Sequence, residues 1–94
     1  MNIIDKMIQK KTIDKFGADI QSTICMEECA ELIQAISKMK RGKEDKRDNL
    51  IEEMADVYII LEQLQYIYDI GDSEIENWIV CKQDRQLRVL ENAD

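Results

Sequence analysis

Two acidic segments, EECAE at residues 27–31 and EEMAD at residues 52–56, decide the fold because each lies in the middle of a strongly helical stretch. Residues three apart in an α-helix project from the same face, so each segment carries a pair of carboxylates side by side. A short charged connection separates the two stretches, which predicts two antiparallel helices joined by a turn. The sequence therefore predicts two carboxylate pairs on neighbouring helices.

These carboxylates point toward the apolar faces of their helices. Glu28 lies about 30° from the centre of one apolar stripe, with Glu31 beside it. Glu53 lies inside the stripe of the next helix, and Asp56 borders that stripe. Ionised carboxylates brought together in a low-dielectric groove cost several kcal/mol each, at the order-of-magnitude level, unless protons or cations compensate them. A set of carboxylate oxygens in a chain without histidine matches Mg²⁺ or Mn²⁺ and disfavours Zn²⁺.

Length and composition predict one all-α domain over residues 1–94. The chain has no proline, three glycines and 45% hydrophobic residues, with few runs of β-branched side chains. A domain of this size lies near the lower end of those that fold alone, so uncovered apolar surface favours association.

The three glycines stand where helical periodicity breaks, which predicts left-handed caps at the ends of helices. Four helices are expected, at residues 2–16, 19–41 and 48–68 and after Gly71, with Asp72 or Ser73 as the cap of the fourth. Residues 42–48 are expected to form a mostly solvated loop. Trp78 is interpreted as a core residue of the fourth helix.

The third helix is apolar on nearly every side from Val57 to Leu61, which predicts burial between protomers as well as within one. We therefore expect a homodimer or a homotetramer, built as a helical bundle around two long antiparallel central helices. Cys25 and Cys29, spaced four apart on an apolar face, are expected to pack as reduced side chains rather than serve redox or metal chemistry.

Charge excludes several classes of partner. The net charge of −7 argues against binding to nucleic acid or to an anionic membrane. No apolar run approaches the roughly 20 residues that span a bilayer, and residues 1–6 lack the pattern of a signal peptide. We expect a cytoplasmic protein.

A family resemblance follows from the order of these motifs. Phe16-Gly17 is followed by Glu27-Glu28-x-x-Glu31-Leu32, a basic turn, Glu52-Glu53-x-x-Asp56-Val57 and Lys82-x-x-Arg85. Over roughly residues 16–88 this sequence resembles the MazG-like nucleotide pyrophosphohydrolases. The resemblance implies an all-α, oligomeric enzyme that uses Mg²⁺ to hydrolyse nucleoside triphosphates to monophosphates and pyrophosphate, with a possible role in cleaning the nucleotide pool.

The resemblance also implies roles for individual residues. Its four metal ligands would be Glu28, Glu31, Glu53 and Asp56, the same four that the helical placement selects, and Glu27 would orient water from outside the ligand set. Lys82 and Arg85 would contact phosphate oxygens, although a solvated helix face is an equal reading of this pair. The chain reads Lys82-Gln83-Asp84-Arg85-Gln86 where family members often carry an asparagine shortly after the lysine.

Gln21 lies in the apolar sector about two turns before Glu28. Its amide suits either a hydrogen bond to a nucleobase edge or a satisfied position in the core, of which the core position is favoured.

Two other functions remain open at this point. One is phosphoribosyl-ATP pyrophosphohydrolase activity, found in short helical proteins with similar acidic segments. The other is a non-catalytic acidic helical module, such as a regulatory or phage-encoded protein that sequesters a basic partner. The second predicts no divalent-metal binding, which separates it from both enzymes.

Overall fold

The computed structural model describes residues 3–93, apart from the side chain of residue 44, and its regular structure is helical throughout that range. The chain forms α1 (Lys6–Phe16), α2 (Ala18–Lys40), a 3-10 turn η1 (Glu44–Lys46), α3 (Arg47–Ile67) and α4 (Asp72–Glu91). The predicted all-α class is confirmed. The predicted bounds of the second and third helices agree with α2 and α3 to within one residue.

The first helix starts later than predicted because Asp5 caps it. The Asp5 carboxylate accepts hydrogen bonds from the backbone N–H groups of Met7 at 2.9 Å and Ile8 at 3.1 Å. A capping residue has extended backbone and so marks the end of the helix on its amino-terminal side. Residue 2, where the helix was predicted to begin, lies outside the described residues. The predicted loop at residues 42–48 contains η1 and the first two residues of α3.

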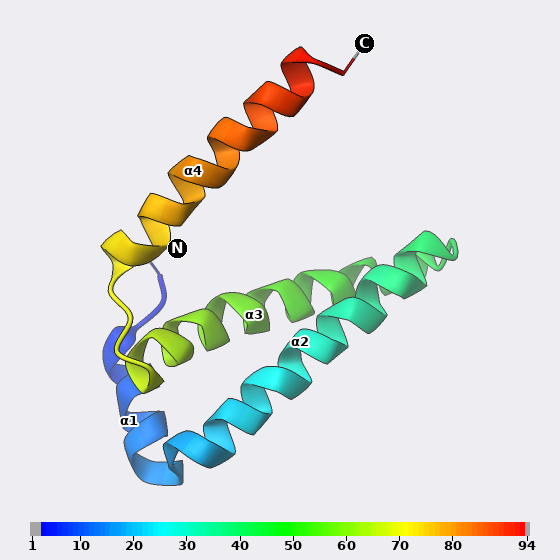
Figure 1. Cartoon of the computed structure of the whole chain (residues 1–94). Helices are drawn as coiled ribbons and strands as arrows, with labels where there is room; N and C mark the ends of the chain where they lie inside the picture. Colours follow the sequence, from blue (N-terminus) through cyan, green and yellow to red (C-terminus); the bar gives the residue numbers. More distant parts are fainter. Residues whose placement is uncertain (1–2, 94) are drawn as a thin grey trace.

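The long helices α2 and α3 form an antiparallel hairpin, and α1 packs across its open end (Figure 1). Cys25 and Ala35 of α2 and Ile60 of α3 are buried between them, together with Ile13 of α1. Cys25 thus packs in the core as predicted. Cys29 is exposed, contrary to the prediction, because it lies about 100° farther around α2 than Glu28, beyond the seam with α3.

A chain of buried amides fixes how these three helices meet. Gln63 of α3 donates to the side-chain oxygen of Gln9 of α1 at 2.8 Å and accepts from the Gln21 amide of α2 at 3.4 Å. The Cys25 thiol lies 3.8 Å from the same Gln63 oxygen. Buried amides without partners are costly, so this network favours one register of α1, α2 and α3 over others.

Two glycines adopt the positive φ expected of them, and the third does not. Gly17 has φ +94° and Gly42 has φ +78°, but Gly71 has φ −83°. The residue with positive φ after α3 is Asp69, at +53°. Aspartate tolerates this region better than most residues do, so the chain reverses earlier than the position of Gly71 predicts.

The start of α4 also differs from the prediction that Asp72 or Ser73 caps it. Gly71 is the capping residue, and its N–H donates to the Glu74 carboxylate at 2.8 Å. Asp72 lies inside the first turn, where its carboxylate accepts from Gln65 at 2.7 Å and pairs with Lys6 at 3.5 Å. Because the Asp72 carboxylate makes these contacts, it does not cap the backbone N–H groups at the start of α4.

The fourth helix projects away from α2 and α3 (Figure 1). It has no buried residue, and Trp78 is 61% exposed. The interpretation of Trp78 as a core residue is therefore wrong for the single chain, because α4 does not fold back onto the hairpin. The radius of gyration is 16.2 Å, whereas a compact chain of this length has a value of about 12 Å.

Within the described residues, no helix combines the length and the apolar character that a membrane span requires.

Candidate active site

Four carboxylates meet between the middle of α2 and the middle of α3. Glu28 and Glu31 come from α2 and Glu53 and Asp56 from α3, and one oxygen of each lies within 4.8 Å of the others. Because residues three apart project from the same face of a helix, the two carboxylates of each pair point the same way. The antiparallel packing of α2 and α3 makes the two pairs face each other. Carboxylate oxygens gathered at this spacing form a candidate site for a divalent cation.

The deep part of this cluster is buried. Glu53 is 8% exposed, and the Oε2 atoms of Glu28 and Glu53 are buried without a hydrogen-bond partner. The other Glu53 oxygen accepts a hydrogen bond from the Asn49 side chain at 3.4 Å. Buried acceptors without donors are rare in folded proteins, since each has lost its hydration without compensation. The two bare oxygens fit a bound cation.

Burial and mutual repulsion disfavour the charged forms of these acids. Loss of hydration, followed by the nearby Asp56 and Glu31 carboxylates, raises the pKa of Glu28 from 4.5 to about 7. The pKa of Glu53 is also raised, first by burial and then by Glu31. A divalent cation would reverse both effects because it stabilises the ionised carboxylates.

The cluster opens to solvent on one side. Glu31 is exposed and Asp56 is partly exposed, so the four acids are not sealed in the core. Glu27 and Glu52, the first residues of the two acidic segments, are exposed and lie outside the group of four. Sequence reasoning missed Asn49, which its i, i+4 spacing from Glu53 places within reach of that carboxylate.

Gln21 lies in the buried amide network, where its amide donates to Gln63. This hydrogen bond gives the Gln21 amide a partner in the core, so its burial is explained without invoking a ligand. Sequence reasoning also missed Gln9 and Gln63. The available signal was spacing: Gln63 follows Asp56 by seven residues, just as Gln21 precedes Glu28 by seven, which continues the same polar seam along both helices.

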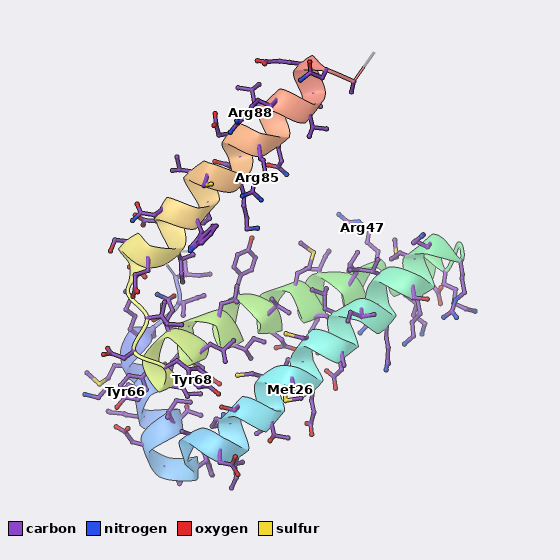
Figure 2. The ribbon with its side chains drawn as sticks, in the orientation of Figure 1. Met26, Arg47, Tyr66, Tyr68, Arg85 and Arg88 are labelled. Atoms are coloured by element: carbon purple, nitrogen blue, oxygen red, sulfur yellow. The ribbon has the colours of Figure 1, made fainter. Side chains whose placement is uncertain are left out.

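Lys82 and Arg85 lie on α4, which projects away from α2 and α3 (Figure 1), and Arg85 is labelled on that helix in Figure 2. The Lys82 ammonium lies 5.9 Å from the centre of the Trp78 ring, and an Arg85 guanidinium nitrogen lies 4.0 Å from the Cys81 sulfur. Neither side chain forms an ion pair within residues 3–93. The single chain therefore does not unite the two basic residues with the four acidic ones.

The fold and the cluster together define an all-α protein with a four-carboxylate site, suited to a hard divalent cation, between two antiparallel helices. This chain belongs to the MazG nucleotide pyrophosphohydrolase family, whose domain model matches residues 20–77. The match includes all four clustered carboxylates and stops before Lys82 and Arg85. No curated protein and no solved structure matches the chain. Family membership assigns a nucleotide pyrophosphohydrolase activity at the level of the family.

Proposed function

We propose that this protein is a Mg²⁺-dependent nucleoside triphosphate pyrophosphohydrolase that converts a ribo- or deoxyribonucleoside triphosphate and water to the monophosphate and pyrophosphate. The observation that carries the proposal is the group of four carboxylates, of which two have buried oxygens without partners. An acidic cluster on a protein surface needs no ion. A desolvated cluster inside a helical hairpin does need compensation.

The donor set favours Mg²⁺, with Mn²⁺ as the alternative, because all four donors are hard oxygens. Glu28, Glu31, Glu53 and Asp56 would hold the ion. When bound, it supplies neutralisation of phosphate oxygens and a lower pKa for the attacking water. The exposed Glu27 lies one residue before Glu28, where its carboxylate would orient that water from outside the ligand set.

The remaining substrate contacts are also proposals. Lys82 and Arg85 would bind phosphate oxygens and offset the charge that develops on the leaving pyrophosphate. Gln21 would contact the nucleobase only if the substrate displaced its hydrogen bond with Gln63. We further propose that the active form is a homodimer or a homotetramer, because the single chain leaves much apolar surface uncovered.

The deciding experiment is a substrate panel in Mg²⁺ and in EDTA. It should include canonical and damaged nucleoside triphosphates and phosphoribosyl-ATP, with products identified by phosphorus NMR. We expect Mg²⁺-dependent release of pyrophosphate rather than orthophosphate. In ¹⁸O-water the label should enter the nucleoside monophosphate, since water attacks the α-phosphate.

Other outcomes would reject the proposal in distinct ways. Activity confined to phosphoribosyl-ATP would move the protein to that substrate class. Label in the pyrophosphate would place the attack on the β-phosphate instead. The absence of both turnover and calorimetric Mg²⁺ binding would favour a non-catalytic module.

A further inference from the structure

The turn that joins α2 to α3 is the basic part of an otherwise acidic chain. Residues 38–47 hold 6 of the 13 basic residues and 2 of the 20 acidic ones. The basic members are Lys38, Lys40, Arg41, Lys43, Lys46 and Arg47. The turn lies at the end of the hairpin away from α1 and from the start of α4 (Figure 1). Its positive charge is therefore carried by the same two helices that hold the four carboxylates.

Helix dipoles explain only part of this positive charge. Lys38 and Lys40 lie in the last turn of α2, where the partial negative charge of the helix end favours cations. Lys46 caps the start of α3 and Arg47 is its first residue, where the helix dipole disfavours cations, and Asp48 offsets only one of these two charges. No ion pair among the described side chains involves these four basic residues. An anion bound at the turn would offset the repulsion between them.

Lys38 lies on the side of α2 where the carboxylate cluster opens. It follows Glu31 by seven residues, which is two helical turns and about 10 Å along α2, and it projects within about 20° of Glu31. Glu31 is the exposed member of the cluster, so Lys38 and the open side of the cluster share one flank of the helix. Lys38 is partly buried, whereas Lys40 is exposed and projects about 180° from Glu31.

Lys46 lies at the same end of the hairpin. It precedes Glu53 by seven residues, and between them is Asn49, whose amide donates to the Glu53 carboxylate. Two backbone hydrogen bonds connect Lys46 to Lys38 through Lys43. The Lys43 N–H donates to the Lys38 carbonyl at 3.2 Å, and the Lys46 N–H donates to the Lys43 carbonyl at 2.9 Å. These bonds hold the backbones of Lys38 and Lys46 together about two helical turns beyond the carboxylates.

A triphosphate bound at the cluster needs more positive charge than one metal ion supplies. The four carboxylates carry more negative charge than one Mg²⁺ neutralises, and the triphosphate adds to it. Toward α1 the seam between α2 and α3 continues with the neutral amides of Gln21 and Gln63. Toward the turn it continues with Lys38 and Lys46. Charge therefore favours a phosphate chain that extends from the cluster toward the turn.

We propose that Lys38, together with Lys46, binds the terminal phosphate of the nucleoside triphosphate. The substrate then lies along the seam with its phosphate chain toward the α2–α3 turn and its nucleoside toward α1. The two lysines select triphosphates over diphosphates, because a diphosphate lacks the group that they bind. They belong to the chain that holds the metal, so they add to the contacts proposed for Lys82 and Arg85 wherever α4 packs. The inference rests on the proposed function for the identity of the anion.

Two double variants separate a specific contact from the general field of the turn. Lys38→Gln/Lys46→Gln removes the two proposed ligands, and Lys40→Gln/Lys43→Gln removes the same charge from the same turn. With a nucleoside triphosphate and Mg²⁺, we expect kcat/KM to fall at least about tenfold in the first variant, the effect of losing charge-assisted hydrogen bonds. In the second variant it should fall by less than about threefold. With the diphosphate of the same nucleoside, the two variants should differ by less than about threefold.

Three results of this experiment would overturn the proposal. Equal losses in the two double variants would mean that the turn acts only through its overall charge. Equal losses for the triphosphate and the diphosphate in Lys38→Gln/Lys46→Gln would mean that the lysines do not bind the terminal phosphate. A lower urea midpoint in that variant alone, with a matching loss of Mg²⁺ binding, would mean that the lysines support the fold instead.

A binding measurement requires no turnover. Pyrophosphate is titrated into the Mg²⁺-loaded protein in a calorimeter. We expect its Kd to rise at least about tenfold in Lys38→Gln/Lys46→Gln and less than about threefold in Lys40→Gln/Lys43→Gln. An unchanged Kd in the first variant, or no binding by wild type, would overturn the proposal. If wild type hydrolyses no nucleotide but the expected Kd values are found, the proposed function fails and the anion site at the turn stands.

Discussion

At the scale of single residues, Glu53 is the most informative position because its carboxylate is buried and one of its oxygens has no partner. Replacing it by glutamine keeps the shape of the side chain and removes the charge. We predict that Glu53→Gln lowers Mg²⁺-dependent hydrolysis by about 100-fold or more, since loss even of residues behind a metal ligand costs about 10- to 100-fold. Steady-state rates of pyrophosphate release measure this effect.

The same substitution should raise the melting temperature in EDTA, because it removes an uncompensated buried charge. It should also abolish the additional stabilisation by Mg²⁺. Glu52→Gln is the matched control, since Glu52 is the neighbouring acid and is exposed. Equal effects of the two variants would contradict the assignment of Glu53 to the metal.

Glu28 predicts how stability depends on pH in the absence of metal. Its pKa is raised from 4.5 to about 7 in the folded chain, so between these values the folded state binds more protons than the unfolded state does. This contribution is fully present below pH 4.5 and is lost as pH rises through 7. We therefore predict that the melting temperature in EDTA falls as pH rises from about 4.5 to 7.

Added Mg²⁺ should have the opposite dependence. The ion binds ionised carboxylates, so the rise in melting temperature that it causes should be larger at pH 8 than at pH 5.5. Calorimetric scans at both values, with and without the metal, measure the difference. A Mg²⁺ effect that is equal at both would mean that Glu28 is not part of the binding group.

Helical periodicity was sufficient to find the four carboxylates before the structure, because the i, i+3 rule fixes directions within one helix. It was not sufficient for contacts that depend on how helices meet. The hydrogen bonds of Gln63 to Gln9 and Gln21 depend on the register among α1, α2 and α3. The pattern of polar and apolar residues along one helix does not specify how far that helix is shifted along its neighbours.

At the scale of secondary-structure elements, the amide network predicts how α1 is held. Replacing Gln63 by leucine deprives the buried amides of Gln9 and Gln21 of their shared partner. We predict a loss of about 1 to 3 kcal/mol in the free energy of unfolding, the typical cost of leaving a buried polar group unsatisfied. Urea denaturation measures this loss.

Gln34→Leu is the control for that experiment, because Gln34 is exposed on α2 and its substitution should change stability by about 0.5 kcal/mol or less. If Gln63→Leu is as stable as wild type, the network does not fix the packing of α1. Mg²⁺ affinity should change little in either variant, since Gln63 lies two helical turns beyond Asp56.

The existence of all four helices was predictable, whereas the direction of the last one was not. Glycine placement indicated where helices end, yet the reversal after α3 occurs at Asp69, which adopts a positive φ, rather than at Gly71. The orientation of α4 depends on the contacts of Gln65 and Lys6 with Asp72. Side-chain contacts between residues 66 positions apart, such as Lys6 and Asp72, leave no periodic signal in the sequence.

At the scale of the whole molecule, buried apolar surface is scarce for a folded chain. Among the described residues the buried apolar side chains are Ile13, Cys25, Ala35 and Ile60. Large apolar side chains are exposed on α2, α3 and α4, including Met26, whose position on α2 is visible in Figure 2. A small domain with so little core depends on association for stability. The prediction from residues 57–61, that α3 contacts more than its own chain, rests on the same physical argument.

Folding coupled to self-association makes stability depend on protein concentration, because dilution favours the separated, unfolded chains by mass action. We predict that the melting temperature rises steadily with concentration, and that light scattering at micromolar concentration gives a dimer or a tetramer. Trp78 provides a local readout as the sole tryptophan, exposed in the single chain. Its emission should shift to shorter wavelength as association buries the ring. A monodisperse monomer with a concentration-independent melting temperature would contradict the prediction, and it would require α4 to be stable while its apolar side chains face water.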